Sequence, residues 1–351
     1  MLLSMLSRPF VMALLGLLVL GNAGCDDSGA PPASTVEAPG SATTLPSVPT
    51  PAATPRPVPT ATPEPTPIVI ADLPIIDLHF HPDPAWGSAL PALFDQIGVR
   101  LAGNGASGPG SIALAEAERH AGRIVAFTGG YELRQLVSTY GEAAWQATHP
   151  EAERVIAGIE ESLRSGAAHG IGELHVNNRM SNLPNAPQYR YPADAPLLRR
   201  LWELAARYGV PVSVHLDAEA ESVAEMERLL ASDRQGAWLW AHAGHYAEPE
   251  LLRRLLSQHS NLYCELSYRL SISSSRTAIP LDQAGRLRED WRALLEEFPD
   301  RFVLGTDTGF VSASLYAQHI SSWRLILEQL SPETAAKVAF SNAARLLRLS
   351  P

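Results

Sequence analysis

The strongest signal in the sequence is the run Ile75-Ile76-Asp77-Leu78-His79-Phe80-His81. It is an apolar stretch that ends in two histidines separated by one residue. Residues i and i+2 of a β-strand point to the same face, so both imidazoles would converge on one point. Neutral imidazole nitrogen is a common ligand of zinc and similar ions. The run therefore predicts a strand that delivers two metal ligands, although an exposed histidine pair can have the same spacing.

Four further polar side chains each close a short apolar run and come directly before a loop. They are Glu173 in Gly-Ile-Gly-Glu-Leu-His, His215 in Val-Pro-Val-Ser-Val-His-Leu, His242 in Trp-Leu-Trp-Ala-His-Ala-Gly and Asp307 in Phe-Val-Leu-Gly-Thr-Asp-Thr. Imidazole and carboxylate groups are the side chains that hold divalent metal ions. The order of these residues makes the metal interpretation far more specific than the histidine pair alone.

With these residues in place, the chain resembles the amidohydrolase superfamily, and within it the broad amidohydrolase-related group of metal-dependent hydrolases. The resemblance runs from about Leu73 to the C-terminus. It includes the run Phe-Ser-Asn-Ala-Ala-Arg-Leu-Leu at residues 340–347, which is similar to the family's terminal helix. The resemblance implies a barrel with a metal site at the C-terminal ends of its strands.

The resemblance also implies roles for the polar set. His79, His81 and His215 are expected to bind metal. Asp307 is expected to bind metal and to accept the proton of an attacking water. His242 matches a histidine that orients or polarises the substrate in one-metal branches and binds the second ion in two-metal branches.

Several of these positions have alternative interpretations. His245, three residues after His242, is the rival for the same role but lies further into the loop. Asp307 could instead form a turn or cap a helix. Asp77, one step back on the face of the histidine pair, is expected to be a structural hydrogen-bonding group below the site.

Glu173 bears on the number of ions. Family branches with a glutamate or a modified lysine at this strand use it to hold two ions, and branches without it keep one. The alternative for Glu173 is an ion pair with an arginine or a neighbouring strand, and His175, two residues on, is a weaker candidate ligand. The expected cofactor is therefore a divalent metal, zinc by preference, with one or two ions bound.

The rest of the chain predicts the barrel independently. Strand-like runs occupy residues 75–81, 98–102, 124–128, 170–175, 211–216, 237–242, 261–267 and 301–307. Helix-period stretches occupy residues 113–120, 151–165, 195–208, 222–231, 248–259, 291–298 and 315–330. Eight alternating strands imply a parallel sheet closed as a (β/α)8 TIM-type barrel, in which all strand ends meet at one mouth. A doubly wound open sheet is the alternative.

The N-terminus carries an export signal. A basic residue, Arg8, precedes an apolar run at residues 10–20, which is too short for a membrane span of about 20 residues. Small residues then precede Cys25. This resembles a bacterial lipoprotein signal over residues 1–24 with a lipid on Cys25, although Asn22 stands where leucine is usual. An ordinary cleaved signal with an incidental cysteine is the alternative.

Residues 25–67 are rich in Pro, Thr and Ala and poor in large apolar side chains. Such a segment cannot bury enough surface to offset its chain entropy, so we expect a disordered tether. The predicted location is the cell envelope, with a lipid-anchored domain at residues 68–351 facing the periplasm or the exterior. The membrane is thus an expected partner through Cys25.

Charge and cysteine content exclude other classes. The net charge of −10 and the absence of clustered basic residues argue against a nucleic-acid partner. The remaining cysteine, Cys264, lies in an apolar run and predicts a small buried residue rather than part of a disulfide framework. The sequence does not indicate an oligomeric state.

The expected reaction is hydrolysis of a small ester, lactone or amide. A bound divalent ion lowers the pKa of water from near 16 to about 7. The same residue set also supports non-oxidative decarboxylation in one branch of the group, and a tethered, non-catalytic metal- or ligand-binding protein is a further alternative. Candidate substrate contacts are Arg190, Tyr191, Tyr268, Arg269 and the possible pocket wall Trp86. Arginines in such loops more often form surface ion pairs, and Trp86 could equally pack the rim.

Overall fold

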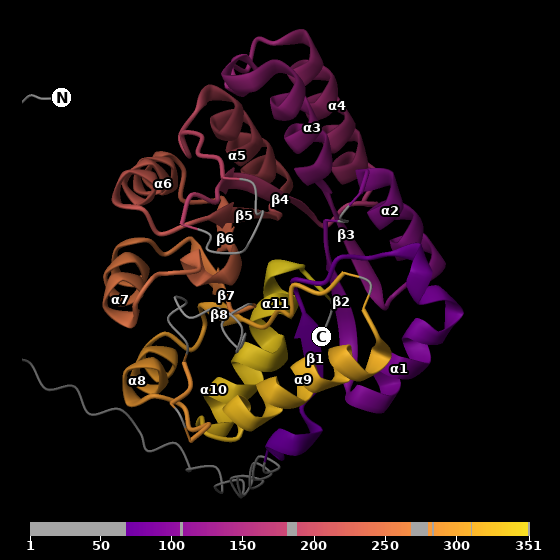
Figure 1. Cartoon of the computed structure of the whole chain (residues 1–351), viewed down its shortest axis with the longest axis vertical. Helices are drawn as coiled ribbons and strands as arrows, with labels where there is room; N and C mark the ends of the chain where they lie inside the picture. Colours follow the sequence, from indigo (N-terminus) through magenta and orange to yellow (C-terminus); the bar gives the residue numbers. More distant parts are fainter. Residues whose placement is uncertain are drawn as a thin grey trace, which may run out of the picture. The chain divides into compact units, whose positions relative to one another are not determined.

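The structure is a computed structural model, and it describes residues 68–105, 108–180, 188–267, 280–282, 284–309 and 311–349. Eight parallel strands each pair with their neighbour in sequence, in the order β1 to β8. The strands are β1 Ile75–Asp77, β2 Val99–Asn104, β3 Ile124–Gly129, β4 Gly170–Asn177, β5 Pro211–Leu216, β6 Ala237–Trp240, β7 Leu262–Glu265 and β8 Phe302–Val303. The predicted (β/α)8 barrel is confirmed, and Figure 1 shows the strands at the centre with helices around them.

Helices cover the outside of the sheet (Figure 1). They are α1 Leu90–Ile97, α2 Gly110–Arg119, α3 Gly130–Tyr140, α4 Pro150–Arg164, α5 Pro196–Tyr208, α6 Ala220–Ser232, α7 Pro249–Gln258, α8 Glu289–Glu297, α9 Ala313–Leu327, α10 Pro332–Ala336 and α11 Asn342–Leu346. The sequence prediction missed α1 and α3. The spacing of Leu133, Leu136 and Val137, which α3 buries, is helical and could have revealed that helix.

The ring closes through the segments that carry the first and last candidate ligands. The backbone N–H of Leu78 donates to the carbonyl of Leu304 (2.9 Å), and the N–H of His81 donates to the carbonyl of Thr308 (2.8 Å). In return, the N–H of Asp307 donates to the carbonyl of His79 (2.7 Å). Barrel closure and site assembly therefore use the same backbone hydrogen bonds.

Two apolar layers hold the barrel together. Side chains between the strands and the outer helices form the larger cluster, which includes Trp202, Trp238 and Trp291. A second cluster contains Ile76, Phe127 and other strand residues together with Ala343, Leu346 and Leu347 at and just after α11. The terminal helix therefore packs against strand residues of the barrel, and burial of these side chains contributes roughly 1.5–3 kcal/mol for each large one.

Strand boundaries differ from the predicted ones in three strands that were expected to carry ligands. The eighth strand was expected to reach Asp307, but β8 ends at Val303. The first strand was expected to extend to His81, but β1 ends at Asp77. The residues after it have no regular strand geometry, although their backbone still forms hydrogen bonds to residues 304 and 308. The sixth was expected to reach His242, but β6 ends at Trp240, because His242 and Ala243 adopt positive φ values of 57° and 47°. Backbone turns of this kind re-aim side chains at a barrel mouth.

The signal, Cys25 and the tether fall within residues 1–67, which lie outside the described residues. They remain predictions. In the part of the chain that the structure describes, no helix combines the length and the apolar character needed to cross a membrane. Cys264 is fully buried in β7, as expected from its apolar run.

Candidate metal centre

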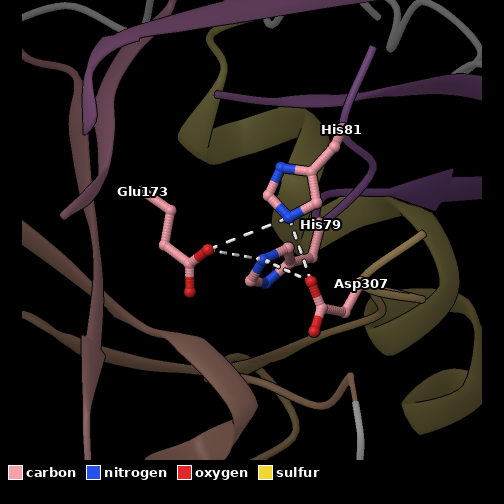
Figure 2. Close-up of side chains that lie close together, drawn as sticks. All are labelled: His79, His81, Glu173 and Asp307. Carbon is pink, nitrogen blue, oxygen red and sulfur yellow. Dashed lines mark hydrogen bonds and ion pairs between the residues drawn. The ribbon is translucent and has the colours of Figure 1, made fainter. Parts of the chain in front are cut away.

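Four predicted ligands converge at the mouth of the barrel (Figure 2). His79 Nε2 lies 3.2 Å from Glu173 Oε2 and 3.4 Å from Asp307 Oδ1. His81 Nε2 lies 3.0 Å from the same Asp307 oxygen and 3.8 Å from Glu173 Oε2. The histidines follow β1, the glutamate lies in β4 and the aspartate follows β8, so the folded barrel unites three distant parts of the sequence. We call this group the first side of the centre.

A second group meets the other oxygen of the same glutamate. Glu173 Oε1 lies 3.3 Å from His215 Nδ1 and 3.3 Å from His242 Nε2, and these two nitrogens are 3.1 Å apart. His215 lies in β5 and His242 in the turn after β6. We call His215 and His242 the second side of the centre. Glu173 is thus placed between two sets of potential ligands, with one oxygen facing each.

The donor atoms fit a divalent metal ion. Zinc binds histidine nitrogen and carboxylate oxygen at about 2.0–2.2 Å in tetrahedral geometry, which places neighbouring donor atoms about 3.3–3.6 Å apart. The separations on both sides of Glu173 lie close to this range. A mixed set of imidazole and carboxylate ligands suits zinc, manganese or iron rather than calcium. Each side could hold one ion, with Glu173 shared between them.

The histidines of the first side are held in the tautomer that metal binding needs. His79 Nδ1 donates to Glu265 Oε2 at 2.6 Å, and His81 Nδ1 donates to the carbonyl of Gly105 at 2.5 Å. When the ring is neutral, each Nε2 therefore presents its lone pair to the centre, an arrangement typical of metal-bound histidines.

A hydrogen-bonded chain also fixes His242. The Ser267 hydroxyl donates to Glu265 Oε2 at 2.7 Å, so its oxygen is left to accept from His242 Nδ1 at 2.8 Å. Glu265 also accepts from the His242 backbone N–H at 3.2 Å. One fully buried carboxylate thus positions His79 directly and His242 through Ser267.

The sequence prediction missed Glu265. It closes the apolar run Leu-Tyr-Cys-Glu of β7, which is the same signal that marked the other site residues. Glu265 also lies within ligand distance of His79 and His242, but its short hydrogen bond to Nδ1 of His79 assigns it to orienting that ring.

On the second side, the nearest partner of His215 Nε2 is the neutral amide of Asn178, and the buried Asp217 carboxylate lies 3.9 Å away. His215 Nε2 donates to the side-chain oxygen of Asn178 at 3.2 Å, which leaves Nδ1 facing Glu173 and His242. His245 instead groups with His215 and Asp217, with its Nδ1 3.6 Å from Asp217 Oδ1. Of the two rivals after β6, His242 is the one that faces Glu173.

Electrostatics keep the carboxylates ionised and the imidazoles basic. Burial alone would lower the pKa of His79, but Glu173, Glu265 and Asp307 raise it well above its usual value. Burial would raise the pKa of Asp307, but His79 and His81 lower it to about 2. The pKa of Glu173 is likewise lowered well below its usual value, because the surrounding histidines outweigh burial. The centre is therefore a cation-binding environment.

Asp77 has the structural role expected of it. Its carboxylate accepts hydrogen bonds from Thr306 N (3.0 Å), Thr306 Oγ1 (2.7 Å) and the Tyr316 hydroxyl (3.0 Å). Burial raises the pKa of Asp77 to about 6, in spite of these donors. The contacts tie β1 to the loop that carries Asp307 and to α9.

Two suggested substrate contacts have other roles. Arg190 pairs with Glu225 (2.6 Å) and Glu221 (3.2 Å), so its guanidinium fastens the loop after β4 to α6. Trp86 is buried and packs against Phe80 and Tyr316, with ring centroids 5.8 Å apart in each pair. These contacts match the alternatives of an ion pair for Arg190 and of packing for Trp86. Tyr268 and Arg269 lie outside the described residues.

The fold and the site together define a class: a (β/α)8 barrel with a histidine and carboxylate centre at the C-terminal ends of its strands. Residues 76–349 match the sequence profile of the amidohydrolase family. The protein belongs to this family, as its sequence resemblance predicted. Comparison with curated proteins gave no match.

Comparison with solved structures gave matches at low sequence identity. An uncharacterized TIM-barrel protein from Bordetella bronchiseptica is 13% identical, covers 79% of this chain and 99% of its own, and has a TM-score of 0.54. A 2,6-dihydroxybenzoate decarboxylase from Rhizobium is 14% identical over 79% of this chain and 99% of its own, with a TM-score of 0.49. An amidohydrolase from Burkholderia multivorans is 16% identical over 79% of this chain and 100% of its own, with a TM-score of 0.47.

Proposed function

We propose that the protein is a metal-dependent hydrolase of a small ester, lactone or amide, with two divalent ions held on either side of Glu173. The observation that supports this proposal most directly is the position of the Glu173 carboxylate. One oxygen faces His79 and the other faces both His215 and His242. A glutamate paired only to an arginine or a neighbouring strand would not meet imidazoles with both oxygens.

The residues of the centre have separate roles in metal binding and proton transfer in this proposal. His79, His81 and Asp307 would hold one ion, His215 and His242 the other, and Glu173 both. When bound, such ions supply a water of lowered pKa and polarise a carbonyl group. Asp307 is ionised, and its side chain is 19% exposed against 5% for Glu173, so it is the more accessible carboxylate. We assign it as the acceptor of the water's proton, which it then returns to the leaving group.

Metal analysis combined with a substrate screen tests the proposal. We expect elemental analysis to find two ions per chain in the natural protein and one or fewer in Glu173→Ala. The metal-loaded protein should then hydrolyse a member of a panel of lactones, esters and amides. The exposed Glu297→Gln, whose partner Arg253 lies at the surface, is the matched control and should keep both ions.

Three other results would contradict a two-metal hydrolase. One ion that is unaffected by Glu173→Ala would make this glutamate structural. Release of carbon dioxide from a carboxylic acid substrate, without hydrolysis, would identify a decarboxylase. No bound metal after reconstitution would leave a binding protein without metal chemistry.

We also propose that the protein is lipid-anchored in the cell envelope, because the apolar run at residues 10–20 is followed by small residues and Cys25. We propose zinc as its natural metal, because the candidate ligands are histidine nitrogens and carboxylate oxygens. In cells fed an alkyne fatty acid, the natural protein should be labelled and sediment with membranes. Cys25→Ala should lose both properties. Label on Cys25→Ala would contradict the anchor, and manganese or iron in the protein as isolated would contradict zinc.

A further inference from the structure

His175 is a histidine beside the candidate metal centre that has no role in the proposed binding of the ions. It lies in β4, two residues after Glu173 and so on the same face of the strand. Its register partner on β5 is His215, and the two rings stack with centroids 5.6 Å apart at 14°. His175 Nε2 lies 3.9 Å from Glu173 Oε2, the oxygen that faces the first side. The ring therefore borders both sides of the centre.

The His175 ring is more accessible than the neighbouring candidate ligands. Its side chain is 26% exposed, against 13% for His215 and 14% for His81. Among the residues that the structure describes, Nδ1 has a hydrogen-bond partner, and the nearest charged group to Nε2 is the Glu173 carboxylate, beyond hydrogen-bond distance. A small molecule at the centre could therefore bond to Nε2.

Tyr189 holds the other nitrogen of the ring. Its hydroxyl lies 2.8 Å from His175 Nδ1. The carbonyl of Tyr189 accepts from the backbone N–H of Asn178 (3.0 Å), and the N–H of Tyr191 donates to the carbonyl of Val176 (2.9 Å). The segment that carries Tyr189 is thus bonded, backbone to backbone, to the strand that carries His175.

These contacts favour one tautomer of His175. Burial raises the pKa of Tyr189, so its hydroxyl keeps its proton and can donate it to Nδ1. A neutral imidazole that accepts at Nδ1 carries its own proton on Nε2. The Glu173 carboxylate near Nε2 favours the same tautomer, because its negative charge attracts the N–H group. His79 and His81 have the reverse arrangement, since each donates from Nδ1.

A hydrogen-bond donor is the component that the six assigned ligands do not supply. Their four histidines would turn a nitrogen lone pair toward an ion, and their two carboxylates accept hydrogen bonds. Negative charge develops on a carbonyl oxygen when water adds to the carbonyl carbon. An N–H group placed at that oxygen stabilises the transition state more than the substrate, and so raises the rate.

We propose that His175 is a further catalytic residue, which donates a hydrogen bond from Nε2 to the carbonyl oxygen of the substrate, and that Tyr189 is the positioning residue that holds it in this tautomer. The inference rests on the proposed hydrolase function. As water adds, the oxygen gains the electron pair of the C=O π bond, and His175 keeps its proton. When that pair re-forms the C=O bond, the C–O or C–N bond breaks and the leaving group takes the proton from Asp307.

Nitrogen-15 NMR of the histidine rings reads the tautomer without any substrate. Spectra are recorded for the metal-free and the zinc-loaded protein, and the His175 signals are those that disappear in His175→Asn. We expect the ring proton on Nε2 in the natural protein and a larger share on Nδ1 in Tyr189→Phe. A ring proton on Nδ1 in the natural protein would overturn the proposal.

Two substitutions separate donation from packing. Glutamine places an amide N–H near the position of Nε2, whereas asparagine places one near Nδ1 and can keep the contact with Tyr189. With zinc-loaded protein and 4-nitrophenyl acetate, we expect kcat to fall about 10²–10³-fold in His175→Asn and clearly less in His175→Gln, with KM and metal content nearly unchanged. Binding of methylphosphonate, a tetrahedral oxyanion, should weaken about tenfold or more in His175→Asn alone. The matched control is His169→Asn, which lies just before β4 at the other end of the strand and should change none of these quantities.

The results distinguish failure of this inference from failure of the hydrolase. Turnover and methylphosphonate binding that are equal in His175→Asn and the natural protein would overturn the donor and leave the hydrolase intact. Equal losses in His175→Asn and His175→Gln would indicate packing or metal binding and would also overturn the donor. A natural protein that holds metal but hydrolyses no ester, lactone or amide would refute the hydrolase. Methylphosphonate binding that still depends on His175 in that protein would leave the donor assignment standing.

Discussion

The two sides of Glu173 differ in the charge of their ligands and of the groups that hold those ligands. The first side combines His79 and His81 with Asp307, and the fully buried carboxylate of Glu265 stands behind His79. The second side offers two histidines, His215 held by the amide of Asn178 and His242 by the hydroxyl of Ser267. Negative charge attracts a cation more strongly in a buried site than neutral donors do. We therefore expect the first side to bind its ion more tightly and to fill first.

The backbone supports the two sides in different ways. The ligands of the first side lie where the barrel closes, and backbone hydrogen bonds join residues 78–81 to residues 304–308. On the second side, His215 lies in the regular strand β5. Each side also has one ligand with positive φ, Asp307 (54°) on the first and His242 (57°) on the second. The sides therefore differ more in the charge of their ligands and partners than in backbone support.

Asp307→Asn should produce the largest change. The substitution keeps the shape of the side chain but removes the proposed proton acceptor and a charged ligand of the first side. We expect kcat to fall by about 10²–10⁴-fold, with the ion of the second side retained. Steady-state kinetics and metal analysis on the same preparation measure both quantities. Full turnover in Asp307→Asn would contradict the assignment of Asp307 as the proton acceptor, and with it the difference in catalytic role between the two sides.

Glu265→Gln should come next, with an effect on metal affinity. The variant replaces the acceptor of the His79 Nδ1 hydrogen bond with a group that can donate or accept, so the ring is no longer held in one tautomer. Loss of such a partner typically costs about 10–100-fold in metal affinity. Because Ser267 links Glu265 to His242, both sides should weaken, the first more than the second. Chelator competition measures the two affinities. An unchanged metal affinity of the first side would show that Glu265 does not contribute to that affinity.

The pH dependence of metal binding should differ between the sides. Burial lowers the pKa of His79 and His81, but the neighbouring carboxylates outweigh it and raise both values in the metal-free protein. Raised values mean that these rings hold protons near neutral pH, which an incoming ion must displace. Affinity should therefore fall as the pH drops and rise as the pH increases, by about tenfold per pH unit for each proton released.

Calorimetry in buffers of different ionisation heat counts the protons released. We expect binding of the first ion to release more protons than binding of the second. His79 faces three carboxylates, whereas the nearest carboxylate to His215 is Glu173 and the others are further away. Equal proton release for both ions would contradict the electrostatic difference between the sides.

The sequence predicted which polar side chains converge at the barrel mouth, because their signal is local. Each predicted ligand follows or ends an apolar strand run, and a closed barrel brings such ends together whatever their separation in sequence. Glu265 carries the same signal in β7 and was overlooked. Asn178 and Ser267 carry no comparable signal, because their importance comes from hydrogen bonds to residues in other strands. The turn at His242 was also hidden, since positive φ outside glycine leaves little trace in composition.

Arg190 shows an ambiguity that the sequence left open between a substrate clamp and an ion pair. A basic residue in a long loop at the barrel mouth fits a substrate clamp, but the carboxylates of Glu221 and Glu225 on α6 already engage it. Those partners lie more than thirty positions away, so sequence alone could not separate the two roles.

Asn178→Ala should have the smallest effect on metal binding, and we expect that effect only on the second side. The variant removes the acceptor that holds His215 Nε2, and a single hydrogen bond of this kind contributes roughly 0.5–1.5 kcal/mol. We expect the affinity for the second ion to fall by no more than about tenfold, with the first ion unaffected. Asn178→Asp is the informative partner, because a carboxylate behind His215 would reproduce the arrangement that Glu265 makes behind His79. If the greater strength of the first side comes from its charge, Asn178→Asp should tighten the second ion. If Asn178→Asp weakens that ion as Asn178→Ala does, geometry rather than charge separates the two sides.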